Sequence, residues 1–161
     1  MAVLPIRTIG DPVLRSRSKE VEEITDKTKE LIDNMIDSME AAEGIGLAAP
    51  QIGVLQRVII VQIDDDLKVT INPVAVKKEG ESVAEEGCLS VPGKTGLVKR
   101  AEKVTINGLN PEGEAVKYEL EGLKARAFLH EIDHLNGTLF IDKALEIKEE
   151  EEVDPDSGVI T

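Results

Sequence analysis

Apolar residues between positions 31 and 42 recur every three or four residues, which is the spacing of one buried helix face. Thr25 or Asp26 is placed to cap the start of this helix. Gly44 is placed to end it, because helices commonly end at a left-handed residue. We predict that the methionines of this stripe fill the core and bind no cofactor. The stripe consists of Leu31, Ile32, Met35, Ile36, Met39 and Ala42.

Two pairs of apolar segments further along the chain predict β-hairpins. Residues 57–63 and 67–76 are rich in valine and isoleucine, and the acidic triplet 64–66 separates them. We interpret the triplet as a solvated turn, because it lacks the glycine and the later glutamate of a calcium loop. Residues 104–109 and 114–120 roughly alternate in polarity around an Asn-Pro-Glu-Gly turn. Strands followed by a single late helix predict an α+β fold.

That late helix is predicted over residues 122–136, and its two faces differ in character. One face is apolar and suits the core, whereas the opposite face mixes apolar residues with both histidines of the chain. Such a mixed face suits the wall of a pocket that holds a metal ion. The apolar face consists of Ala125, Phe128, Ile132 and Leu135. The mixed face consists of Leu123, Ala127, His130 and His134, flanked by Arg126 and Glu131.

The two histidines lie in the segment His130-Glu131-Ile132-Asp133-His134. Residues four positions apart project from one helix face, so both imidazoles can bind a single metal ion. Glu131 is then placed to accept a proton from a water molecule at that ion. A catalytic metal usually takes three protein ligands, and the chain has no third histidine. The remaining ligand must therefore be Cys88 or a carboxylate.

Residues 44–53, with the sequence GIGLAAPQIG, carry almost no side-chain bulk. Such a loop lets a ligand or another backbone approach closely. Its glycine spacing matches neither a dinucleotide-binding nor a phosphate-binding loop. Gln51 is the only side chain in it with hydrogen-bond donors, and from the sequence it fits a tight turn as well as a binding role.

Composition narrows the classes of function. The chain has 161 residues, of which 41% are hydrophobic, and this suits one globular domain. A net charge of −13 and an aromatic content of 2% argue against nucleic acid as a direct partner. There is no apolar run long enough to cross a membrane and no secretory signal pattern, and a single cysteine agrees with the reducing cytoplasm. We predict one domain over residues 1–147 and a disordered acidic tail over 148–161.

Three segments resemble, in this order, the three motifs of the peptide deformylase family: GIGLAAPQ at 44–51, EEGCLS at 85–90 and HEIDH at 130–134. The resemblance extends from residue 4 to about residue 145. It implies antiparallel strands packed around a central helix that carries the HExxH motif. The implied activity is hydrolytic removal of the formyl group from the N-terminal methionine of newly made polypeptides. The implied cofactor is one divalent metal ion, Fe²⁺ natively, with Zn²⁺ or Ni²⁺ as replacements.

The resemblance also implies a role for individual residues. The metal ligands would be Cys88, His130 and His134. Catalysis would depend on Glu131 as proton acceptor and on two donors to the formyl oxygen, the Gln51 amide and the Leu89 backbone N–H. The substrate-binding set would be Gly44, Ile45, Gly46, Gly87, Leu123, Arg126 and Ala127. Support for the ligands would come from Glu86 and from a pair formed by Arg100 and Asp133.

Two positions depart from the family pattern. Residues 93–96 lack the aromatic residue or arginine that relatives often carry at the rim, so recognition beyond methionine is left open. Leu129 stands where a glutamine is common. The sequence also shows no basic C-terminal helix that could bind the ribosome, so binding to the ribosome is left open as well. The expected partners are N-formylmethionyl peptides and nascent chains, with no membrane, for a cytoplasmic monomer.

Two other classes of function fit parts of the pattern. A metalloprotease or other amidase built on HExxH would cleave unformylated peptides, whereas a deformylase requires the formyl group. A non-catalytic module stabilised by a metal would need neither Glu131 as a base nor Gln51 as a donor. We therefore expect an enzyme.

Overall fold

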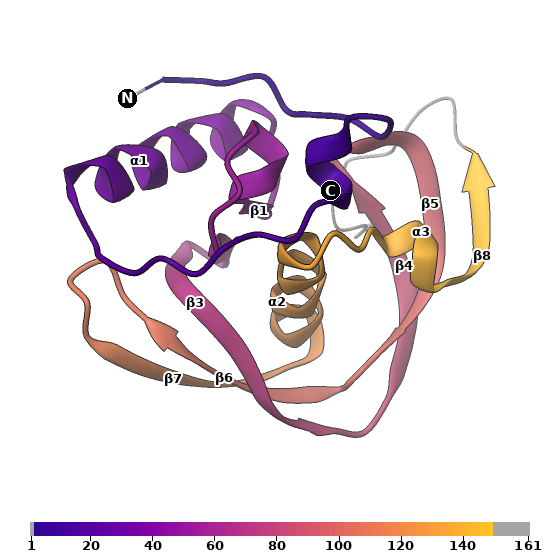
Figure 1. Cartoon of the computed structure of the whole chain (residues 1–161). Helices are drawn as coiled ribbons and strands as arrows, with labels where there is room; N and C mark the ends of the chain where they lie inside the picture. Colours follow the sequence, from indigo (N-terminus) through magenta and orange to yellow (C-terminus); the bar gives the residue numbers. More distant parts are fainter. Residues whose placement is uncertain (1, 150–161) are drawn as a thin grey trace.

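In the computed structural model, which describes residues 2–149, helix α2 (Gly122–Leu135) lies among the strands of two antiparallel sheets (Figure 1). One sheet has the strand order β1-β2-β3-β6-β7, and the other has the order β4-β5-β8. The strands are β1 (Gly46–Ala48), β2 (Val58–Ile63), β3 (Asp66–Glu79), β4 (Ser82–Cys88), β5 (Val91–Arg100), β6 (Lys103–Leu109), β7 (Ala115–Glu121) and β8 (Ala144–Glu149). The other helical elements are η1 (Pro12–Arg15), α1 (Asp26–Ala41), η2 (Ala49–Ile52) and α3 (Phe140–Lys143). The predicted α+β fold, with antiparallel strands around the HExxH helix, is confirmed.

Helix α1 begins where the sequence predicted but ends differently. Met35 and Met39 are fully buried, which confirms that they fill the core. The prediction that Gly44 is the left-handed end residue is wrong, because Glu43 takes that conformation, with φ of 57°. The Gly44 N–H instead donates to the Met39 carbonyl at 3.0 Å and satisfies one of the last helical acceptors.

Both predicted hairpins form. Asp64 and Asp65, between β2 and β3, have φ of 54° and 61°, as a tight two-residue hairpin turn requires. The hairpin of β4 and β5 was not predicted, because its glycines, lysines and glutamates show no clear alternation of polarity. The predicted loop at 44–53 instead contains β1 and η2, since β1 pairs with β2 along the edge of the larger sheet.

The C-terminal strand β8 pairs with β5 and extends two residues beyond the domain boundary predicted at 147. The rest of the predicted acidic tail, residues 150–161, lies outside the described part of the chain. Within residues 2–149, the helices lack the length and apolar character needed to cross a bilayer.

The apolar face of α2 packs on the larger sheet. Phe128 and Leu135 are buried in one cluster with Ile59 and Ile106 from the strands, as the helix pattern predicted. Burying a large aliphatic or aromatic side chain contributes roughly 2 kcal/mol, so these contacts hold the helix firmly against the sheet. The mixed face of α2 is thereby directed toward β1 and toward the end of β4, where Cys88 lies.

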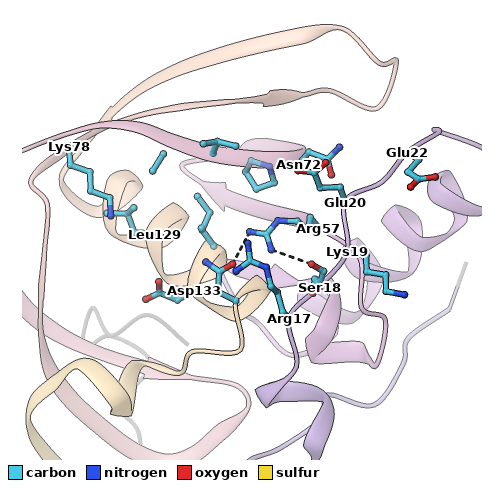
Figure 2. A pocket seen from close by; sticks show the side chains of 15 residues that line it. Arg17, Ser18, Lys19, Glu20, Glu22, Arg57, Asn72, Lys78, Leu129 and Asp133 are labelled. Atoms are coloured by element: carbon cyan, nitrogen blue, oxygen red, sulfur yellow. Dashed lines mark hydrogen bonds between the residues drawn. The ribbon is translucent and has the colours of Figure 1, made fainter.

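A cavity of about 810 Å³ lies elsewhere on α2, and none of the candidate metal ligands lines it (Figure 2). Here Arg57 donates to the carbonyls of Leu135 at 3.1 Å and Ser18 at 3.4 Å, and to the side chain of Asn136 at 3.0 Å. These bonds satisfy acceptors at the C-terminal end of α2 and connect the segment around Ser18 to it. Arg57 therefore stabilises the contact between these two segments.

Candidate metal centre

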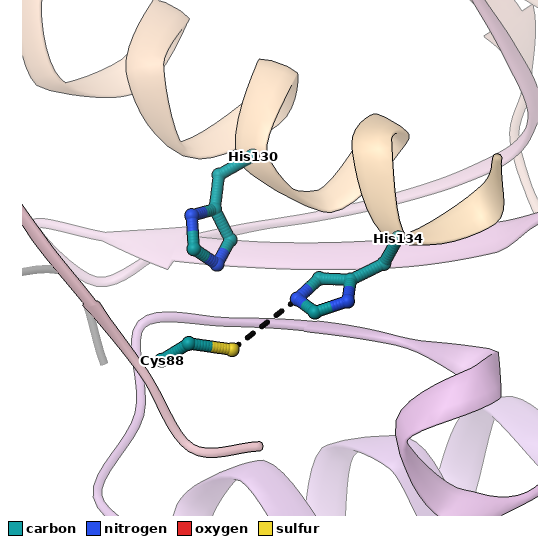
Figure 3. Close-up of side chains that lie close together, drawn as sticks. All are labelled: Cys88, His130 and His134. Carbon is teal, nitrogen blue, oxygen red and sulfur yellow. Dashed lines mark hydrogen bonds between the residues drawn. The ribbon is translucent and has the colours of Figure 1, made fainter. Parts of the chain in front are cut away.

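Cys88, His130 and His134 converge on one point between β4 and α2 (Figure 3). One ligand atom from each residue lies within 4.8 Å of the others. The Cys88 sulfur is 3.3 Å from Nε2 of His134, and the two imidazole rings have centroids 5.1 Å apart. Cys88 ends β4 at a break in the strand register, which lets its side chain leave the sheet toward the helix.

The three side chains fit a divalent transition metal. A thiolate and two imidazoles form the mixed sulfur and nitrogen donor set that suits Fe²⁺, Zn²⁺ or Ni²⁺. All three residues are buried, so an ion bound there would be shielded from bulk water. Three protein ligands leave a coordination position for water or substrate. Of the two alternatives for the third ligand, the structure favours Cys88.

Glu131 lies beside the ligands, with its carboxylate against the backbone of Gly46 in β1. The residue is 1% exposed, and its Oε1 has no hydrogen-bond partner among the described residues. Burial raises the pKa of this carboxyl to about 7, despite the opposing effect of His130. A carboxylate with a free oxygen and a pKa near neutrality is suited to accept and return a proton.

Gln51 both stabilises a tight turn and directs donors toward the centre, the two roles that its sequence position left open. Its Oε1 accepts from the backbone N–H of Ala48 at 2.9 Å, which stabilises the turn around η2. Its amide nitrogen lies 3.1 Å from the Ser90 hydroxyl and 3.7 Å from the Cys88 sulfur. The turn therefore holds the donors of Gln51 toward the metal centre.

Glu86 supports His130 from behind, accepting from its Nδ1 at 2.8 Å. Arg100 binds the same carboxylate through two nitrogens, each at 2.9 Å, and also contacts Asp133, so the predicted pair of Arg100 and Asp133 is confirmed as a contact. Burial alone would raise the pKa of Glu86, but hydrogen bonds from Arg100 and His130 hold it well below its usual range. The ionised carboxylate fixes His130 with Nδ1 protonated, which leaves Nε2 free to bind a metal.

The predicted substrate-binding residues fall into two groups. Most lie in or beside β1 and β4, each of which pairs with one strand among the described residues, or on the mixed face of α2. Arg126 is the exception, because its guanidinium is bonded to Glu86, Val98 and Ser82 within the protein. This placement favours a role in supporting Glu86 over contact with substrate. The first group consists of Gly44, Ile45, Gly46, Gly87, Leu123 and Ala127.

Ser90 also contacts the centre, although the sequence did not single it out. Its backbone N–H lies 3.4 Å from the Cys88 sulfur, and its hydroxyl accepts from Gln51. A donor two residues after a metal-binding cysteine stabilises the thiolate. The signal was present in the EEGCLS segment, where a serine closes the motif.

Comparisons with known proteins agree with this geometry. A family model described as polypeptide deformylase matches residues 3–150. A peptide deformylase from Halothermothrix orenii is 59% identical over 152 residues, covering 93% of this chain and 99% of the relative. The crystal structure of peptide deformylase from Thermotoga maritima superposes with a TM-score of 0.88 at 41% identity, covering 91% and 100% of the two chains. A class I type b peptide deformylase from Acinetobacter baumannii, solved with Met-Ala-Ser bound, has a TM-score of 0.85 at 35% identity, covering 88% and 98%.

Proposed function

Because this chain belongs to the peptide deformylase family and removes the formyl group from N-terminal formylmethionine, we propose how its own residues divide that work. The observation that carries the proposal is the meeting of Cys88, His130 and His134 beside a buried carboxylate and an amide. The carboxylate belongs to Glu131 and the amide to Gln51. A purely structural metal site would need neither group.

Cys88, His130 and His134 hold the ion. When bound, a divalent ion supplies Lewis-acid chemistry, because it lowers the pKa of water and stabilises negative charge on oxygen. Fe²⁺ is the ion we propose for the cell, and Zn²⁺ or Ni²⁺ fits the same ligands. Glu86 keeps His130 oriented, and Arg100, which Asp133 holds in place, keeps Glu86 ionised.

Glu131 acts as the general base and then as the general acid. Its carboxylate accepts a proton from the attacking water as the bond from water oxygen to formyl carbon forms. When the carbon–nitrogen bond breaks, the same group returns the proton to the departing amine, and formate leaves. The raised pKa of Glu131 suits both transfers near neutral pH.

Gln51 and Leu89 stabilise the charge that develops on the formyl oxygen. The Gln51 amide carries two N–H donors, and the adjacent turn already fixes its other end through Ala48. The backbone N–H of Leu89 lies directly after Cys88 in the chain and forms the second donor. Donors held in place before the reaction contribute most to such stabilisation.

The peptide binds as an extended strand between β1 and β4. Among the described residues each of these strands pairs on one side only, so Gly46 and Gly87 offer backbone groups to a peptide at the other side. The methionine side chain enters a pocket made by Ile45, Leu123, Ala127 and the His130 ring. Leu123 is 45% exposed, which leaves apolar surface available for this contact. The relative solved with Met-Ala-Ser bound supports a methionyl peptide as the ligand.

We further propose that the enzyme acts as a monomer on nascent chains in the cytoplasm, without direct contact to nucleic acid. Formate release from formyl-Met-Ala-Ser, measured with anaerobically purified protein and metal analysis of the same sample, tests the assignment. The expected result is formate release with bound iron, no cleavage of unformylated peptides, and loss of turnover in Glu131→Gln with the metal retained. Internal cleavage of an unformylated peptide would instead support a metalloprotease.

A further inference from the structure

Arg126 joins the helix that carries the two histidines to the sheet that carries the cysteine. Its Nη1 donates to Oε2 of Glu86 in β4 at 2.6 Å and to the carbonyl of Val98 in β5 at 2.8 Å. Its Nη2 donates to the carbonyl and hydroxyl of Ser82, at the start of β4, at 2.9 and 3.0 Å. One guanidinium thus spans both strands from its position on α2.

These contacts complete the surroundings of the Glu86 carboxylate. Oε1 accepts from His130 and Arg100, and Oε2 accepts from Arg100 and Arg126. The Glu86 side chain is 0% exposed, so bulk solvent does not reach it in the folded protein. A buried carboxylate that loses one donor moves or loses its other bonds, because an unsatisfied acceptor in the interior is costly.

We propose that Arg126 is a positioning residue for the metal site, acting through Glu86 on His130 and through β4 on Cys88. Glu86 precedes Cys88 by two residues in β4, and His130 follows Arg126 by one helical turn. The guanidinium therefore sets the distance between the cysteine ligand and the histidine ligands. This inference rests on the proposed metal ligation, but it assigns Arg126 a role distinct from substrate contact.

A positioning role predicts a change in metal affinity that needs no substrate. Replacing Arg126 with methionine keeps an unbranched apolar stem and removes every donor. Zinc affinity of Arg126→Met, measured by competition with a chromogenic chelator, is expected to fall about 10- to 100-fold. The visible spectrum of the cobalt-loaded variant is expected to shift, because the ligand geometry around the ion changes.

Arg126→Lys keeps the charge but cannot contact Glu86, Val98 and Ser82 together, so its zinc affinity is expected to lie between those of wild type and Arg126→Met. If Arg126→Met does not fold, as judged by circular dichroism, Arg126→Lys decides the question alone. Lys124→Met serves as the matched control, because this cation lies on the same helix and is not a donor to Glu86. The control is expected to bind zinc like wild type.

The outcomes separate this inference from the proposed function. Weaker zinc binding in both Arg126 variants, with KM for formyl-Met-Ala-Ser nearly unchanged in zinc-saturated protein, supports the positioning role. A raised KM with wild-type zinc affinity would show that Arg126 contacts substrate and would overturn it. Wild-type zinc affinity and wild-type KM together would overturn it as well. Absence of deformylase activity in wild type would contradict the proposed function while leaving the zinc measurement valid.

Discussion

A Cβ atom added to Gly46 would lie 2.6 Å from Oε2 of Glu131. Gly46 belongs to β1, on the larger sheet, and Glu131 belongs to α2, so this close approach joins the two elements that border the metal centre. The backbone at Gly46 is not in the left-handed region, so its conformation does not require glycine. Glycine is required there because a side chain would collide with Glu131. The carboxylate proposed as the general base therefore occupies the volume that a side chain at position 46 would require.

Gly46→Ala is expected to displace the Glu131 carboxylate while leaving the metal ligands in place. A displacement of about 1 Å in a catalytic group can lower turnover about 100-fold, and we expect a loss of kcat/KM of that order. Formate release measures the loss, and chelator competition checks that zinc affinity is kept. Full activity in the alanine variant would contradict the assignment of Glu131 as the base.

Gln51→Ala is expected to lower kcat roughly 100- to 1000-fold, which corresponds to about 3 kcal/mol of lost transition-state stabilisation. KM is expected to change little, because the donors act mainly on charge that develops during the reaction. Steady-state kinetics with formyl-Met-Ala-Ser measure both constants. Gln56→Ala is the matched control, since Gln56 is an exposed glutamine away from the centre. An equal loss in both variants would argue against the oxyanion role.

Glu131→Gln is expected to stabilise the metal-free protein at high pH. The pKa of Glu131 is about 7 in the folded state and about 4.3 when unfolded, so between these values the folded state binds more protons. The free energy of unfolding therefore falls as pH rises from about 4 to about 7, by roughly 2 to 3 kcal/mol. Glutamine does not titrate, so the free energy of unfolding of Glu131→Gln should not fall in this way.

Urea unfolding of chelator-treated wild type and Glu131→Gln at pH 5 and pH 8 measures this effect. The expected result is an advantage for the variant that is larger at pH 8 than at pH 5. A difference in stability that does not depend on pH would show that the folded pKa of Glu131 is not raised.

Metal removal is expected to lower thermal stability as well as activity. An ion that binds only the folded state, at a concentration 100-fold above its dissociation constant, raises the free energy of unfolding by about 2.7 kcal/mol. For a chain of this length the melting temperature should rise by roughly 5 to 10 °C on addition of zinc. Cys88→Ala is expected to lose most of this rise, because one ligand is missing. Differential scanning calorimetry with and without zinc measures it, and an equal rise in both proteins would place zinc elsewhere.

The local features of this protein could be predicted from sequence because they depend on residues close together in the chain. The spacing of His130 and His134 places both imidazoles on one face of any helix, whatever surrounds it. The apolar stripe of α1 and the turn at Asp64 and Asp65 are equally local. The roles of residues in the three motifs came from family resemblance, and those of Glu131, Gln51 and Leu89 stay predictions until variants are assayed.

The network around Glu86 could not be derived from residue patterns. Glutamate and arginine are usually exposed, yet Glu86 and Arg100 are buried here because each supplies the partner that the other requires. The family resemblance implies that Arg126 contacts substrate, and no residue pattern reveals that Ser82 and Val98 face its guanidinium.

By itself, the sequence determined the helix that presents two imidazoles, two of the hairpins and the apolar faces, because backbone geometry and hydrophobic burial act over a few residues. Only the tertiary structure decided that Cys88 lies 3.3 Å from His134 across 46 positions, that Gly46 leaves room for Glu131, and that Arg126 binds Glu86. These contacts depend on how α2 packs against two sheets, and such packing follows from the combined burial of many side chains rather than from any short pattern.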